Sequence, residues 1–166
     1  MRQLLSLRVG GSVLDLGAGS GRNAIFLAEH GFDVTAVDIC PGQYPRLEHL
    51  EFIQADVRSF KPQKEYDIVL STMLLHFLDG DELINMLAKM HTATKIGGLN
   101  VISVLTTQNI DLVRPHLFSA NELRSYYQIG WRLLSCEESL GEFFFSKTQQ
   151  RVIRQHRAAL IAERIS

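Results

Sequence analysis

The 166-residue sequence is poor in cysteine, in long apolar runs and in net charge, and each shortage excludes a class of protein. Cys40 and Cys136 are the only cysteines, too few for the disulfide framework of a small secreted domain. No stretch approaches the roughly 20 apolar residues that span a bilayer, and residues 1–9 lack the apolar run of a signal peptide. We therefore expect a cytoplasmic protein without a membrane partner.

An excess of positive charge is missing as well. The chain has 17 Lys and Arg against 18 Asp and Glu, a formal net charge of −1. Domains that bind DNA or RNA neutralise phosphates with clustered positive charge, so we expect no nucleic-acid partner. The locally basic stretch 147–164 is typical of a solvated surface. Length and composition suit a single domain, 1–166, with one core and neither linker nor internal repeat.

Short apolar runs alternate with amphipathic stretches along the chain. Strands are predicted at 12–16, 34–37, 50–54, 66–70, 99–105 and 131–136, with a candidate seventh at 157–162 in a segment that also suits a helix. Helices are predicted at 23–30, 81–94 (ended by Gly97-Gly98) and 120–128, the last opened by the capping box Ser119-Ala-Asn-Glu122. This alternation predicts an α/β domain whose parallel sheet is covered by helices on both faces.

Three glycines, Gly17, Gly19 and Gly21, follow the first predicted strand. Their spacing is G-x-G-x-G, and Arg22 stands where the dinucleotide fingerprint G-x-G-x-x-G needs its last glycine. A nicotinamide oxidoreductase is therefore disfavoured. A strand-to-helix turn without Cβ atoms still lets a ligand lie directly on the backbone, at the carboxyl ends of the strands.

Three aspartates follow or interrupt the predicted strands. Asp38, at the end of the second strand, can accept hydrogen bonds from both hydroxyls of a ribose, or it is simply a solvated carboxylate. Asp56, after the third strand, can accept from an adenine amino group while the Val57 N–H donates to the ring; the alternative is a turn or helix-cap aspartate. Asp15, inside the first strand, lies near a cationic end of the ligand or shapes the glycine turn through backbone bonds, and both can hold.

Residues 13–38, with Asp56-Val57 and 66–71, resemble the class I S-adenosylmethionine-dependent methyltransferases. More narrowly, 21–28, 31–38, Ser71-Thr72, 121–127 and Leu140-Gly-Glu142 resemble the tellurite-resistance methyltransferase family. The resemblance covers most of the chain. It implies a Rossmann-like seven-stranded methyltransferase sheet, mostly parallel with an antiparallel last strand, and it favours a strand at 157–162.

The resemblance also implies the cofactor, S-adenosyl-L-methionine, and the part of it that each residue holds. The glycine turn would hold the methionine part, Asp38 the ribose, and Asp56 with Val57 the adenine, while residues 71–76 would face the methyl group. No metal ligand is predicted. The predicted cofactor-binding residues are Asp15, Gly17, Ala18, Gly19, Gly21, Arg22, Asn23, Asp38, Ile39, Asp56, Val57 and Ser71.

Methyl transfer requires mainly orientation and desolvation, and a hydroxyl or amine acceptor also needs a general base. His76, after the fourth strand, is the candidate base, or a helix-start histidine bonded to backbone. Arg114 and His116, after the fifth strand, could attract an anionic acceptor or merely lie on the surface. Residues 143–145, all Phe, could line an apolar acceptor pocket or belong to the core, and His91 is expected on a helix surface.

Three features depart from the family pattern. Few residues precede the glycine turn, whereas similar family members carry an N-terminal helical segment that helps cover the cofactor. Residues 38–50 contain proline and glycine where the family has a helix, so one sheet face is bare or a partner subunit covers it, which leaves a homodimer open. Phe143-Phe144 replaces a His-Arg pair implicated in handling the family's substrate, which argues against tellurite or selenite as acceptor.

Two functions remain in competition at this point. The favoured hypothesis is an S-adenosylmethionine-dependent methyltransferase that acts on a small-molecule acceptor, because the glycine turn and its aspartates form a full set. The alternative is a non-catalytic S-adenosylmethionine-fold module for binding or dimerisation, suggested by the short N-terminus and the missing helix.

Overall fold

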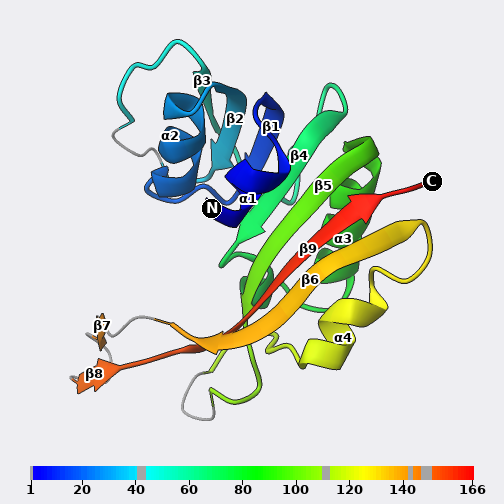
Figure 1. Ribbon diagram of the computed structural model, residues 1–166. Coiled ribbons are helices and arrows are strands. Elements are labelled where there is room, and N and C mark those ends of the chain that lie inside the picture. Colours follow the sequence, from blue (N-terminus) through cyan, green and yellow to red (C-terminus); the bar gives the residue numbers. More distant parts are fainter. Residues whose placement is uncertain (1, 41–43, 110–112, 142–143, 147–150) are drawn as a thin grey trace.

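The computed structural model describes residues 2–40, 44–109, 113–141, 144–146 and 151–166. Seven strands form one mixed sheet (Figure 1) in the order β3-β2-β1-β4-β5-β9-β6. Strands β1 to β5 are parallel, and β9 runs antiparallel to both β5 and β6. The bounds are β1 Gly11–Leu16, β2 Phe32–Asp38, β3 Leu50–Gln54, β4 Tyr66–Thr72, β5 Thr94–Leu105, β6 Trp131–Leu140 and β9 His156–Arg164. The predicted seven-stranded sheet with its antiparallel last strand is confirmed, including the strand at 157–162.

Helices cover both faces of this sheet (Figure 1), as expected. One face carries α1 (Arg2–Leu7) and α2 (Arg22–Glu29), and the other carries α3 (Gly80–Thr92), α4 (Ala120–Ser125) and the 3₁₀ turn η1 (Leu75–Phe77). Successive strand residues point to opposite faces, so Val13 belongs to the core under α2 while Leu14 belongs to the core under α3. Burial on both faces explains why β1, β2, β4 and β5 read as nearly continuous apolar runs.

The prediction that Gly97-Gly98 ends the helix before β5 is wrong. Helix α3 already ends at Thr92, and the glycines lie inside β5, which begins at Thr94. There the register against β4 shifts, from Tyr66 opposite Thr94 to Ile68 opposite Leu99. A Cβ on Gly98 would lie 2.8 Å from the Lys95 carbonyl oxygen, so the pair permits an irregular strand start instead of a helix stop.

Other boundaries differ by a few residues. Strand β6 runs on to Leu140, and α4 ends at Ser125 instead of residue 128. The capping box at Ser119 is present, with Glu122 as its second member. A separate pair of short antiparallel strands, β7 (Phe144–Ser146) and β8 (Arg151–Ile153), extends away from the sheet (Figure 1) and was not predicted.

No helix is found in the described part of the 38–50 connection. Two side chains of this connection instead cover the α2 face beside β2 and β3. The Tyr44 ring stacks on Phe52 with 4.2 Å between centroids, and Leu47 packs against the core under α2. This face is therefore partly covered from within the chain. Among the helices that the structure describes, none is both long and apolar enough to cross a membrane.

Candidate active site

The turn after β1 adopts a backbone that favours glycine. Gly17, Gly19 and Gly21 have φ values of 76°, 56° and 77°. A Cβ on Gly17 would lie 2.9 Å from the Leu74 side chain, and one on Gly21 would overlap the Tyr44 ring. The N–H groups of Gly17 and Ala18 both donate to the Val37 carbonyl, at 2.9 and 3.1 Å, which fixes the turn beside the end of β2.

Asp38 closes this turn from the last position of β2. Its Oδ2 accepts from the Gly19 N–H at 2.7 Å, and its Oδ1 accepts from the Cys40 N–H at 2.9 Å. Each carboxylate oxygen has two acceptor positions, so both oxygens can still accept from a ligand. Asp38 is therefore built into the site and is not merely a solvated carboxylate.

A cleft of about 200 Å³ lies at the carboxyl ends of β1, β2 and β3. It brings together five of the predicted cofactor-binding residues, Gly17, Asp38, Ile39, Asp56 and Val57. Leu74, from the range 71–76 that was expected near the methyl group, also lines it, whereas sequence reasoning missed Arg58, Leu78 and the half-exposed Phe77. Only the position of Arg58, two residues after Asp56, offered a signal in the sequence. The cleft thus has a polar rim near Asp38 and Asp56 and an apolar wall that follows β4.

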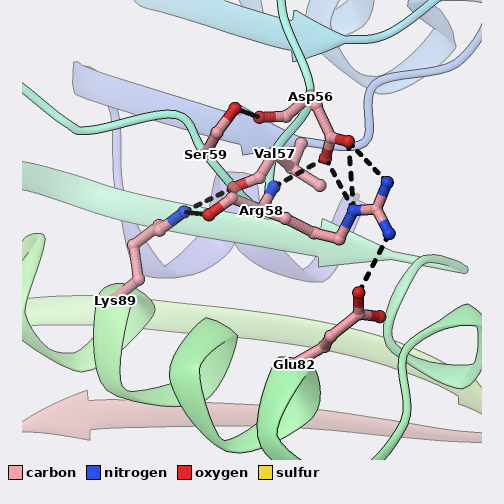
Figure 2. Close-up of polar contacts among 6 residues, drawn as sticks. All are labelled: Asp56, Val57, Arg58, Ser59, Glu82 and Lys89. Carbon is pink, nitrogen blue, oxygen red and sulfur yellow. Dashed lines mark hydrogen bonds and ion pairs between the residues drawn. The ribbon is translucent and has the colours of Figure 1, made fainter.

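Asp56 is bound on both oxygens by Arg58 (Figure 2). Oδ1 accepts from the Arg58 backbone N–H at 2.9 Å and from Nε at 3.0 Å; Oδ2 accepts from Nη2 at 2.6 Å and from Nε at 3.0 Å. These side-chain and backbone hydrogen bonds lower the pKa of Asp56 to about 2, so the carboxylate is ionised. The Asp56 side chain therefore makes a turn, as one alternative had it, and also lines the cleft, while its hydrogen bond to an adenine amino group stays a prediction.

Asp15 lies in the middle of the sheet, paired with Ala36 of β2 and Leu70 of β4. It is fully buried, and neither carboxyl oxygen has a hydrogen-bond partner among the described residues. The expected backbone bonds to the glycine turn are therefore not found. Burial, with the negative charge of Asp38 adding to it, raises the pKa of Asp15 to about 7. A buried carboxyl group in this state would gain from a cationic or hydrogen-bonding ligand.

Arg22 and Asn23 line a second cleft, of about 270 Å³, on the α1 and α2 side. The Asn23 amide donates to the Thr72 hydroxyl at 2.7 Å, which joins the start of α2 to the end of β4. Met73 follows with φ 61°, an uncommon conformation for a residue other than glycine, and its N–H donates to the Ser103 carbonyl at 2.7 Å. Met73 lines the second cleft and Leu74 the first, so the chain leaving β4 separates the two.

His76 lies in η1 and is 1% exposed. Its Nδ1 has no hydrogen-bond partner in the described part of the chain, and the residue lines neither cleft. Burial, with the positive charges of Arg114 and Arg157 adding to it, lowers the pKa of His76 to about 4. The imidazole is therefore neutral at pH 7, the state that a general base requires. Ser71, also predicted near the methyl group, is buried and its hydroxyl is likewise unpartnered.

The remaining candidates have defined partners. Arg114 lies over the Phe77 ring at 5.1 Å, and His116 Nε2 is 2.6 Å from a Glu122 carboxylate oxygen. His91, expected on a helix surface, is only partly exposed, because its ring packs against Tyr127 and Trp131, each at 4.8 Å between centroids. Phe143 lies outside the described residues, as do the side chains of Phe144 and Phe145. No group of three or more metal-ligating side chains occurs among the described residues.

With this geometry in place, comparison with known proteins identifies the family. A model of the family described as "Tellurite resistance protein TehB" matches residues 5–161. The chain belongs to this family. The curated protein "Probable S-adenosyl-L-methionine-dependent methyltransferase TehB" of Haemophilus influenzae strain 10810 is 29% identical over 163 residues, which are 92% of this chain and 57% of that protein. "Hemagglutinin 1" of Eikenella corrodens is 30% identical over 162 residues, 91% of this chain and 54% of that protein.

A solved structure agrees with this TehB assignment. The crystal structure of TehB from Haemophilus influenzae matches with a TM-score of 0.83 and 25% identity, over 98% of this chain and 60% of that chain. The chain therefore spans somewhat more than half the length of the TehB proteins that it matches. Both the family resemblance seen in the sequence and the class I methyltransferase sheet that it implied are confirmed.

Proposed function

We propose that this TehB-family chain is a methyltransferase domain that binds S-adenosyl-L-methionine and methylates a small-molecule acceptor. The observation that carries the proposal is the meeting of Gly17, Asp38, Asp56 and Val57 in one cleft at the carboxyl ends of the parallel strands. Membership of a family whose Haemophilus influenzae relative is named as an S-adenosyl-L-methionine-dependent methyltransferase supports the same activity.

The residues present fit this cofactor. Gly17 has no Cβ, so Leu74 packs directly on the glycine turn and the Gly17 backbone itself lines the cleft. Asp38 would accept from the ribose hydroxyls, and Asp56 with the Val57 N–H would take the edge of the adenine. Asp15, a buried carboxyl group without a partner, suits the ammonium end of the methionine part. When bound, the cofactor supplies a methyl group from its sulfonium and leaves as a neutral thioether.

The second cleft is our proposal for the acceptor site. It lies across the chain leaving β4 from the first cleft, and its polar lining includes Thr72, Ser103 and Arg157. A volume of about 270 Å³ admits only a small molecule. The chain's own part in transfer is to hold the acceptor in line and to keep water out. For a hydroxyl or amine acceptor, a general base within hydrogen-bond reach must also take the proton that the methyl group replaces. His76 is neutral but lines neither cleft, so it can serve only if a movement of η1 brings it to the acceptor.

Calorimetric titration with S-adenosylhomocysteine tests the cofactor half of this proposal. The wild type should bind, and Asp38→Asn should weaken binding about tenfold or more, because hydrogen bonds to a charged acceptor are lost. Asp33→Asn is the matched control, since Asp33 is exposed on the same strand and its carboxylate is bonded to His49 at 2.7 Å. A folded wild type that does not bind S-adenosylhomocysteine would contradict the proposal.

Turnover separates the enzyme from the alternative of a non-catalytic module. A screen of thiol, metalloid, hydroxyl and amine acceptors with S-adenosylmethionine should yield S-adenosylhomocysteine with at least one of them. Binding of the cofactor without any turnover would favour the non-catalytic module.

A further inference from the structure

Arg58 lines the cofactor cleft but belongs to no part of the site predicted from the sequence. Its side chain, about half exposed, bonds two carboxylates, one on each side. Nε and Nη2 hold Asp56, while Nη1 donates to Glu82 Oε1 at 2.9 Å (Figure 2). Glu82 lies in the first turn of α3, so Arg58 ties the adenine end of the cleft to a helix on the sheet.

The hydrogen bonds from Arg58 fix the orientation of the Asp56 carboxylate. An ionised carboxylate offers about four lone-pair sites. Three N–H donors of Arg58, the backbone N–H, Nε and Nη2, already occupy Asp56, and Nε is shared between its two oxygens. The three donors make four contacts, two to each oxygen, so the carboxylate has a fixed plane and a further donor must share an oxygen with Arg58. Without Arg58 it could rotate and accept from water in several orientations.

The backbone that follows Asp56 is also held by hydrogen bonds from a side chain. Lys89 of α3 donates to the carbonyl oxygens of Val57 and Arg58, the latter at 3.0 Å (Figure 2). The Val57 N–H has no hydrogen-bond acceptor among the described residues. The cleft thus presents one directed acceptor, on Asp56, and one unused donor, on Val57. This pair matches the donor amino group and the acceptor ring nitrogen along one edge of adenine.

We propose that Arg58 is a positioning residue that fixes the Asp56 carboxylate toward the 6-amino group of the cofactor's base and so makes the site select adenine over a 6-oxopurine. The inference rests on the proposed cofactor site. A 6-oxo group is an acceptor and would face a fixed carboxylate oxygen, leaving two acceptors without a donor. A carboxylate free to turn away would bind adenine less well and would also reject the 6-oxo base less strongly.

The test titrates S-adenosylhomocysteine and S-inosylhomocysteine into the wild type and into Arg58→Gln. We expect Arg58→Gln to weaken S-adenosylhomocysteine binding about tenfold and to lower the ratio of the two affinities severalfold. Arg58→Lys should not restore either quantity, because an ammonium group cannot make two parallel bonds to a carboxylate. Glu82→Gln removes only the carboxylate that Arg58 Nη1 binds. It should lower the affinity for S-adenosylhomocysteine and the ratio of the two affinities, each by less than Arg58→Gln does. It replaces Arg58→Gln if that variant does not fold.

The matched control is Arg132→Gln, since Arg132 is an exposed arginine ion-paired with Glu163 at the opposite edge of the sheet. It should bind both ligands as the wild type does. Unchanged affinities in Arg58→Gln, or an equal loss for both ligands, would overturn the positioning role and leave the cofactor site standing. A wild type that binds neither ligand would overturn the proposed function itself.

Discussion

The Asp38 carboxylate accepts a hydrogen bond from the Gly19 N–H at 2.7 Å, across 19 residues of sequence. This bond joins the end of β2 to the glycine turn after β1, and both lie at the same edge of the sheet. The two features that the sequence suggested separately, a flexible turn and an acidic strand end, are therefore one structure.

Gly17→Ala should abolish binding of S-adenosylhomocysteine and destabilise the fold. The new Cβ meets a positive φ of 76° and lies 2.9 Å from the Leu74 side chain. Gly31→Ala is the control, because Gly31 has φ 82° with nothing near its Cβ position. Gly31→Ala should lower the free energy of unfolding only by the backbone strain, about 1–2 kcal/mol, and should leave binding of S-adenosylhomocysteine intact. Urea unfolding and calorimetry check this; equal effects of the two variants would show that the Leu74 contact does not matter.

Tyr44→Phe should weaken S-adenosylhomocysteine binding severalfold. The Tyr44 hydroxyl donates to the Gly19 carbonyl at 2.6 Å, and phenylalanine keeps the stacking on Phe52 but loses this bond, worth about 1 kcal/mol. Tyr126→Phe removes a comparable hydroxyl, bonded to Glu122 at 3.3 Å outside both clefts, and serves as the control. The same affinity in both variants would mean that Tyr44 does not hold the glycine turn in its binding shape.

Asp15 should make the stability of the protein fall between pH 4 and pH 7. Burial raises the pKa of Asp15 from 3.8 to about 7, so over this range the folded chain binds a proton that the unfolded chain has lost. That contribution is complete below pH 4 and disappears as the pH rises through 7. Relative to the wild type, Asp15→Asn should therefore gain stability by more than about 1 kcal/mol from pH 4 to pH 7.

Urea unfolding at several pH values measures this difference, and the same scan on Asp33→Asn controls for the loss of a carboxylate. A constant difference between Asp15→Asn and the wild type would show that Asp15 is ionised in the folded chain throughout. Such a result would place a cation or hydrogen-bond donor beside it.

His76→Gln should lower methyl transfer to a hydroxyl or amine acceptor about 100-fold while the affinity for S-adenosylhomocysteine stays within twofold. Because the pKa of His76 is about 4, the wild-type rate should show no dependence on this group between pH 6 and pH 8. Single-turnover kinetics with an acceptor from the screen give the rate, and circular dichroism verifies the fold. Full activity in His76→Gln would assign this buried histidine to packing alone.

The parts of the site that sequence reasoning found depend on local patterns. Gly17 and Asp56 follow strands and Asp38 ends one, so their place at the carboxyl ends of the sheet follows from parallel strands alone. Arg58 was missed because its role arises from a contact across the fold, with Glu82, which lies 24 residues later in the sequence. Leu74 lay in the range expected near the methyl group, but its packing against Gly17 from the turn after β4 was not predicted.

The errors in the predicted fold also come from contacts between segments that lie far apart in the sequence. Gly97-Gly98 resembles a helix stop when only neighbours in sequence are considered, and the β4 register decides that it is a strand irregularity. The His91 ring packs against Tyr127 and Trp131, which come more than 30 residues later in the sequence, and a helical pattern cannot show this contact. Six strands of the main sheet were nevertheless predicted from the sequence pattern, and the seventh was favoured by the family resemblance alone. The signal is strongest in β1, β2, β4 and β5, whose residues are mostly buried on both faces.

The most direct test of the cofactor site is a crystal structure of the chain grown with S-adenosylhomocysteine. The account predicts the ligand in the first cleft, with its ribose hydroxyls on Asp38 and its base against Asp56 and Val57. Ligand density elsewhere, or a base whose amino group points away from Asp56, would contradict it.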